Sequence, residues 1–241
     1  MGGRALQIGG MTLLLRLLPV LAAIAYAIVM WQFSARNLAR QLNTKSHRLR
    51  DPGLDPVLSR MAAALGLPEV PVHVYQVAPV NGLAAPDGRI FLTEGFMNLY
   101  RRGEVSAEEL ASVIAHELGH VAHGHTRRRM IDFSGQNALK VVLGSLLGRV
   151  IPIAGGWIAH MIATTLAARM SQRDEYEADE YASALLIKAG IGTGPQISLF
   201  QKLDRLTGGT ALPAPAWLTS HPATDARIRA IEASCKRWNV A

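Results

Sequence analysis

The sequence predicts a mostly helical α+β domain that follows a single N-terminal transmembrane helix. Three observations lead to this prediction: an apolar run near the N-terminus, two short strand-like segments, and a long helix that carries the pattern His-Glu-x-x-His. The chain has 241 residues and is 49% hydrophobic, so the part that follows the apolar run can bury a core. We expect an anchor with a basic segment over residues 1–50 and one domain over residues 51–241.

The apolar run Leu17–Phe33 has a length at the short end of the range for a membrane-spanning helix. We expect a span over about residues 12–33, in which the long side chain of Arg16 can reach the lipid headgroups. The alternative is a cleavable signal peptide, because Ala23-Ile24-Ala25 resembles a cleavage site. The run continues past that site to Trp31, which favours an uncleaved anchor.

Basic side chains gather directly after the apolar run. Residues 1–50 hold 7 basic and no acidic side chains, and most of the basic ones follow Phe33. This excess predicts that the following domain is cytoplasmic and that the segment lies against anionic lipids. The other 18 basic residues are matched by 18 acidic ones, so the net charge of +7 does not indicate nucleic-acid binding. Cys235 is the only cysteine, which excludes an intrachain disulfide and fits a cytoplasmic domain.

Two segments, Val72–Val77 and Arg89–Thr93, are typical of short β-strands, with Asn81–Ala85 between them. An exposed edge of the resulting sheet could bind an extended peptide through backbone hydrogen bonds, with little selectivity for sequence. The alternative is a small structural sheet whose edge is covered.

The long helix is predicted from its first residues. Ser106 and Glu109 form a capping box, so a helix begins near Ala107. Apolar residues follow at helical spacing: Val105, Leu110, Val113, Ile114, Leu118 and Val121. His116 and His120 are four residues apart and therefore share one face of this helix.

This helix carries the strongest indication of chemistry in the chain. Two imidazoles on one face can bind one metal ion, and Glu117 beside the first is placed to act as a general base for a water. The alternative is a pair of core histidines flanking a glutamate. A buried glutamate without a partner is costly, which weakens that alternative.

A third metal ligand is expected from a second helix. Glu175 can bind the metal, and Asp179, on the same face, can accept a hydrogen bond from a ligand imidazole and fix its tautomer. The alternative is an acidic face in water, where we expect Glu177 and Glu180. Two histidines and one carboxylate suit one zinc ion per chain. His123 and His125 are nearer candidates, but we expect them to end the first helix, pack against it or support the ligands.

Residues 136–170 are apolar but interrupted by Arg149, Pro152 and a pair of glycines. We expect a hairpin of two helices, 136–150 and 154–170, near the active-site cleft rather than a clean membrane span. Whether it enters the membrane or forms a lid stays open. A closing helix is expected over Ala223–Trp238.

Over most of residues 51–241 the chain resembles the HtpX-type membrane zinc metalloproteases, relatives of the CAAX prenyl proteases. The resemblance rests on these stretches: Asn81–Ala84 to Ile90–Thr93, the ten residues from His116, Glu175 to Asp179, and Ser220-His221-Pro222 with Arg227. One departure is Gln172, where family members often have an arginine; Arg173 follows one place later.

This resemblance implies a gluzincin-like peptidase in which His116, His120 and Glu175 hold zinc and Glu117 is the base. It implies an endopeptidase for unfolded or membrane-associated proteins, in protein quality control. His221 either stabilises the oxyanion, occupies a fourth zinc position at rest, or bonds to backbone. The alternative function is a latent membrane-anchored adaptor or chaperone. The sequence gives neither the natural substrate nor the oligomeric state.

Overall fold

The computed structural model describes residues 36–85, 87–125, 155–207 and 225–239, with Leu18, 21–22, 24–26, 28–30, 32–33, Trp217 and His221. The chain divides into two compact units. The first comprises residues 1–38 and 127–171, and the second comprises residues 39–126 and 172–241. We call the second the core unit, because it holds the sheet and the buried side chains discussed below.

The sheet of the core unit is small and mixed. Its four strands are β1 (Ser46–Arg48), β2 (Val72–Tyr75), β3 (Gly82–Ala84) and β4 (Ile90–Thr93), in the order β1-β2-β4-β3. The β2–β4 pair is parallel, whereas β1 pairs with β2 and β3 with β4 in antiparallel fashion. The predicted small sheet is therefore confirmed, and β3 forms one of its edges. The strand at the other edge, β1, is not predicted by the sequence.

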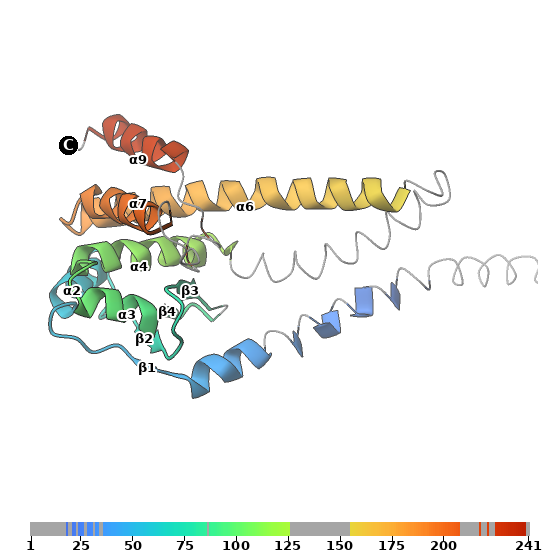
Figure 1. Ribbon diagram of the computed structural model, residues 1–241, viewed down its shortest axis with the longest axis horizontal. Helices are drawn as coiled ribbons and strands as arrows, with labels where there is room; N and C mark the ends of the chain where they lie inside the picture. The colour runs from blue at the N-terminus through green and yellow to red at the C-terminus, as the bar shows by residue number, and fades with distance from the viewer. Residues whose placement is uncertain are drawn as a thin grey trace, which may run out of the picture. The chain divides into compact units, whose positions relative to one another are not determined.

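Helices make up most of the described chain, as predicted. They are α2 (Asp55–Leu65), α3 (Glu94–Arg101), α4 (Ala107–Ala122), α6 (Gly155–Lys188), α7 (Gly194–Thr207) and α9 (Asp225–Arg237). In the core unit α4 lies between α7 on one side and α3 with the sheet on the other (Figure 1). The closing helix predicted over residues 223–238 corresponds to α9.

The start of α4 is fixed by the capping box that the sequence predicts. The Ser106 hydroxyl accepts a hydrogen bond from the backbone of Glu109 at 3.1 Å, and the Glu109 carboxylate accepts one from the backbone of Ser106 at 2.8 Å. Leu110 and Ile114 on α4 are fully buried, and they belong to one apolar core with Leu92 of β4 and other side chains. The helix that carries the histidines is thus the central element of this core.

α6 is a single helix of 34 residues. The sequence predicts a hairpin helix over 154–170 and a separate helix for Glu175, and the structure joins the two. Between Trp157 and Gly190 there is no proline or glycine to interrupt helical hydrogen bonding, which is the physical reason for the continuity. The first helix of the predicted hairpin, residues 136–150, lies outside the described residues.

The N-terminal apolar run is helical where it is described, and its large side chains, such as Leu21, Tyr26 and Val29, are exposed. Within the described part of the chain, none of the helices has both the length and the hydropathy of a membrane span.

Candidate metal centre

The two histidines of α4 point their Nε2 atoms at the same place. His116 and His120 are each 2% exposed, and their rings stand at 87° to one another with centroids 4.7 Å apart. The two Nε2 atoms are separated by 3.1 Å. Their spacing of four residues along the helix produces this convergence.

α6 brings a carboxylate to the same point because it approaches α4 very closely. A methyl group at Gly119 would lie 2.8 Å from the backbone of Ala178, so the contact requires a glycine. Glu175 lies one turn before Ala178, and its carboxylate oxygens are 3.3 Å from Nε2 of His116 and 3.6 Å from Nε2 of His120. The predicted third ligand therefore lies beside the first two.

His221 completes a buried cluster of four. Its Nδ1 lies 2.8 Å from Glu175, 3.3 Å from Nε2 of His116 and 3.4 Å from Nε2 of His120. One donor atom from each of the four residues lies within 4.8 Å of the others. Ligands bound at about 2.0–2.1 Å in a tetrahedron are roughly 3.3–3.5 Å apart, so these separations fit one zinc ion.

Behind His116 lies an ionised pair. Nδ1 of His116 donates to Asp179 at 2.9 Å, and Arg227 donates to both oxygens of Asp179 at 2.6 and 2.8 Å. Burial alone lowers the pKa of His116, but the hydrogen bonds to Asp179 and Glu175 outweigh it and raise the pKa to about 9. Burial raises the pKa of Asp179, and the hydrogen bonds from Arg227 and His116 more than reverse this. All three side chains are buried.

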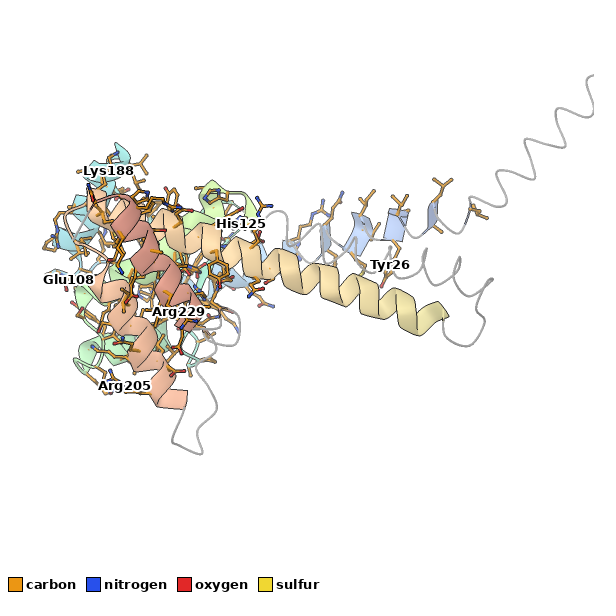
Figure 2. The ribbon with its side chains drawn as sticks, turned by 90° about the horizontal axis from the view of Figure 1, so that it is seen from above. Tyr26, Glu108, His125, Lys188, Arg205 and Arg229 are labelled. Carbon is orange, nitrogen blue, oxygen red and sulfur yellow. The ribbon has the colours of Figure 1, made fainter. Side chains whose placement is uncertain are left out.

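Behind His120 lies another imidazole. Nδ1 of His120 is 3.0 Å from Nδ1 of His125, which comes from the segment directly after α4 (Figure 2). His125 is fully buried, and its Nε2 lies 3.0 Å from Glu177 and 3.5 Å from Asp174. Burial lowers the pKa of His125, although Glu177 and Asp174 oppose the change. Glu177, which we expect in water, faces it only in part: its side chain is 29% exposed and is bonded to His125.

Glu117 lies beside the cluster without belonging to it. It is 2% exposed, and its Oε1 is buried with no hydrogen-bond partner in the described structure. Nε2 of His221 lies 3.5 Å from this oxygen. An unsatisfied buried carboxylate oxygen is costly, so the donor set and this oxygen together fit a metal with a bound water.

The ring of Trp217 packs against one side of the cluster. Trp217 is 1% exposed, and its ring centroid lies 5.8 Å from that of His116 and 5.6 Å from that of His221. Its backbone donates to Val80, just before the β3 strand. Sequence reasoning missed Trp217, because a single tryptophan in a proline-rich stretch carries no periodic or spacing signal.

All six side chains that the sequence analysis selects come together here: His116, Glu117, His120, Glu175, Asp179 and His221. Sequence reasoning gives no role to Arg227, although the residue belongs to the family resemblance. Its position after His221 is the only signal available. The contact of His125 with His120 is foreseen only as general support.

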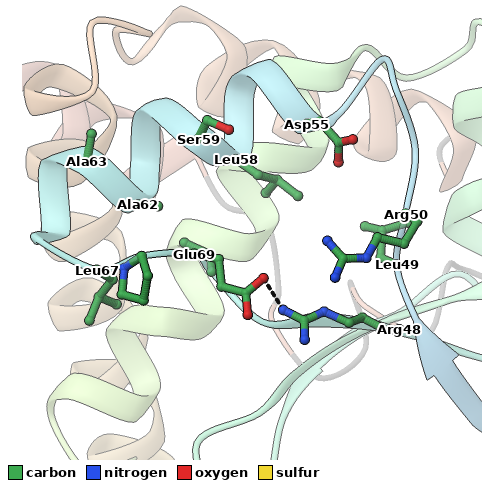
Figure 3. Close-up of a pocket in the computed structure, with 12 residues that line it drawn as sticks. Arg48, Leu49, Arg50, Asp55, Leu58, Ser59, Ala62, Ala63, Leu67 and Glu69 are labelled. Atoms are coloured by element: carbon green, nitrogen blue, oxygen red, sulfur yellow. Dashed lines mark ion pairs between the residues drawn. The ribbon is translucent and has the colours of Figure 1, made fainter.

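A cavity lies elsewhere in the core unit (Figure 3). It measures about 430 Å³ and lies between the end of β1, α2 and residues 67–70. Arg48 and Glu69 form an ion pair in its lining. The lining includes none of the residues of the histidine cluster, so the cavity is separate from the candidate metal centre.

Comparison with known proteins places this geometry in a family. The sequence pattern of peptidase family M48 matches residues 48–234. The metalloprotease LoiP of Escherichia coli is 33% identical over 178 residues, which cover 72% of this chain and 68% of that protein. The metalloprotease YcaL of the same bacterium is 29% identical over 178 residues, covering 72% and 67%. The mitochondrial metalloendopeptidase OMA1 of zebrafish is 27% identical over 173 residues, covering 67% and 34%.

Proposed function

The chain belongs to peptidase family M48 and is a metalloendopeptidase, and from this premise we propose that it is a membrane-anchored zinc enzyme that cleaves unfolded or membrane-associated polypeptides. One observation carries the proposal: a buried cluster of two helical histidines and a carboxylate, beside a glutamate whose Oε1 has no hydrogen-bond partner in the described structure. A role in protein quality control follows from this substrate class.

His116, His120 and Glu175 would hold one zinc ion, because their donor atoms and separations suit it. Zinc supplies a Lewis acid that polarises a carbonyl oxygen and makes hydroxide available near pH 7. Glu117 takes a proton from the attacking water and passes it to the leaving amine of the cleaved peptide. Oε1 of Glu117 has no hydrogen-bond partner in the described structure, so both of its lone pairs can accept a proton, which supports this role.

Asp179 positions the first histidine rather than taking part in the chemistry. Because it accepts from Nδ1 of His116, the neutral imidazole has its lone pair on Nε2, which faces the cluster. Arg227 in turn keeps Asp179 ionised and oriented.

His221 has two possible roles at this site. In one, it donates to the oxyanion that forms during hydrolysis. In the other, its Nδ1 would help to hold the zinc in a resting state and would have to move away before catalysis. Its closeness to Glu175 and both ligand histidines supports the second role, whereas its Nε2 near Glu117 supports the first.

The polypeptide substrate would add to the edge of the sheet. Among the described strands β3 pairs with β4 alone, and a methyl group at Gly82 of β3 would lie 3.6 Å from Oε1 of Glu117. A peptide paired with this edge would bring its backbone close to the base. Backbone pairing gives little sequence selectivity, which suits unfolded substrates.

A membrane anchor is the second part of the proposal. We propose a single span over about residues 12–33 and a basic segment to residue 50, with the domain of residues 51–241 on the cytoplasmic side. The exposed apolar side chains between Leu18 and Phe33 support a lipid-facing helix.

The alternative function is a latent membrane-anchored adaptor that keeps the fold and binds polypeptides without cleaving them. Glu117 argues against it, because binding alone does not require a buried base. The latent adaptor would be favoured only if the wild-type protein binds zinc and cleaves no substrate.

The test measures zinc content and casein cleavage for detergent-purified wild type, Glu117→Gln and Glu175→Ala. We expect about one zinc per wild-type chain with cleavage, retained zinc but a loss of activity of roughly 10²–10⁴-fold in Glu117→Gln, and lost zinc in Glu175→Ala. Glu180→Gln, on the exposed side of α6, is the matched control and should resemble wild type. A folded wild type that binds no added zinc would sink the proposal.

A further inference from the structure

Behind the second ligand histidine lies an imidazole, whereas behind the first lies a carboxylate. Its Nδ1 faces Nδ1 of His125 at 3.0 Å, and both rings are buried. We infer that His125 is a positioning residue for the metal centre: it accepts a hydrogen bond from His120 and anchors that ring to Glu177. The inference rests on the proposed function, because it assumes that His120 binds zinc.

Proton counting fixes the direction of this chain of contacts. His120 turns Nε2 toward the cluster, so a neutral His120 that binds zinc there carries its hydrogen on Nδ1. That hydrogen is donated to Nδ1 of His125, which must then be the unprotonated nitrogen. The hydrogen of neutral His125 lies on Nε2 and is donated to Glu177 at 3.0 Å. Each contact therefore has one donor and one acceptor.

At the outer end of this series of hydrogen bonds, Glu177 interacts with a charged side chain. Glu177 also accepts from Arg173 at 2.7 Å, one turn earlier on α6. Asp174 lies 3.5 Å from Nε2 of His125 as a second acidic neighbour. The chain thus ties the last turn of α4 to α6, the helix that provides Glu175. A displacement of His125 would rotate the His120 ring and misdirect its lone pair.

A peripheral metal site is the competing interpretation of the same side chains. Donor atoms of His123, His125 and Glu177 lie within 4.8 Å of one another. A metal on Nε2 of neutral His125 would move its hydrogen to Nδ1, where it would face the hydrogen on Nδ1 of His120. Two donors 3.0 Å apart repel, so such a metal would oppose zinc binding by His120. The observed contact therefore favours the hydrogen-bonded chain.

The test compares two substitutions of similar size at one position. In His125→Asn the amide oxygen stands near the place of Nδ1 and can still accept from His120, whereas His125→Leu fills the space without an acceptor. We expect zinc affinity, measured by competition with a chelator, to fall roughly 10–100-fold in His125→Leu and only a few-fold in His125→Asn. Circular dichroism verifies that both variants are folded, and rescue by asparagine separates positioning from packing.

His123→Ala is the matched control, since His123 is an exposed histidine of the same segment. We expect it to bind one zinc with wild-type affinity. His120→Ala tests the premise and should lose zinc. If His120→Ala loses zinc but His125→Leu binds like wild type, the inference fails while the proposed function stands. If wild type binds two zinc ions and His123→Ala only one, the peripheral metal site replaces it. If His120→Ala keeps zinc, the ligand assignment fails and the inference falls with it.

Discussion

The two histidines that flank Glu117 look alike in the sequence but are held in different ways. Behind His116 stands an ionised carboxylate, Asp179, with a buried arginine behind it. Behind His120 stands a second imidazole, His125, which ends on a carboxylate that water can reach. We call the side chains behind each histidine its support. The support of His116, Asp179 with Arg227, is buried and ionised, and we call it the closed support. The support of His120 is a buried imidazole, His125, bonded to the partly exposed carboxylate of Glu177.

This difference predicts unequal energies. A hydrogen bond to an ionised acceptor is roughly twice as strong as one between neutral groups. The His116 support should therefore contribute more to stability and to metal affinity, whereas the His120 support should yield more easily. The four predictions that follow test this asymmetry, from the largest expected effect to the smallest.

The strongest challenge to the closed support is Arg227→Ala. It leaves Asp179 and Glu175 buried without their cation, so we expect the free energy of unfolding to fall by about 3–5 kcal/mol. Urea unfolding of wild type and variant measures the loss. Arg237→Ala on the same helix removes an exposed pair with Glu180 and should cost at most about 1 kcal/mol. Equal losses in the two variants would contradict a special role for the closed support.

Gly119→Ala should disturb both supports together. The added methyl group would lie 2.8 Å from the Ala178 backbone and push α6 away from α4. We expect a loss of about 1–3 kcal/mol in stability, despite the higher helix propensity of alanine. Gly194→Ala is the control, because a methyl group there meets nothing within 4 Å. Weaker zinc binding should accompany the loss at residue 119; unchanged stability and affinity would show that the two helices can separate freely.

Asp179→Asn tests whether the two supports contribute differently to zinc affinity. Asparagine keeps an oxygen for Nδ1 of His116 but removes the charge, so we expect zinc affinity to fall roughly tenfold, or about 1.4 kcal/mol. The corresponding change on the other side, His125→Asn, should cost only a few-fold. Chelator competition on both proteins in one experiment gives the ratio. A larger loss for His125→Asn would reverse the order of the two supports.

Glu109 is a buried carboxylate that belongs to neither support, so its contribution to stability serves as a reference for the other three effects. Burial raises the pKa of Glu109, but hydrogen bonds from Lys202, Ser106 and Ser198 hold it below its ordinary value. A group with a lowered folded pKa stabilises the protein above its unfolded pKa of about 4.3, and this stability is lost as the pH falls through the folded value. In metal-free protein, Glu109→Gln should cost about 1 kcal/mol at pH 7 and progressively less below about pH 4. A cost that does not change with pH would contradict this origin.

Local patterns are enough to predict the helix that carries the two histidines. The capping box fixes its start, and the spacing of four residues places both imidazoles on one face, since these depend only on helix geometry. Glu175, the proposed third ligand, is also selected from the sequence, because Glu175 and Asp179 repeat that spacing. The convergence of these side chains on one point follows from the packing of α4 against α6, which no local pattern encodes.

Contacts between distant residues are not predictable in this way. Glu177 is expected in water because its neighbours are charged, yet its partner His125 lies 52 positions away. The strand β1 is three residues long and exists through its pairing with β2, so no alternation reveals it. The continuity of α6 is missed because an apolar segment and an acidic segment differ so much in composition that they suggest separate helices.

The contact at Gly119 has a consequence for related sequences. This residue is one of the two positions that the His-Glu-x-x-His pattern leaves unspecified, while the other, Leu118, is half-buried. Its lack of a side chain lets the backbone of α6 approach α4 closely. We therefore expect a relative with a larger residue there to hold its second helix farther from the first, and to bring its carboxylate to the two histidines with a differently extended side chain. The size of the residue at this unspecified position therefore predicts the distance between the two helices, and it can be taken from a relative's sequence.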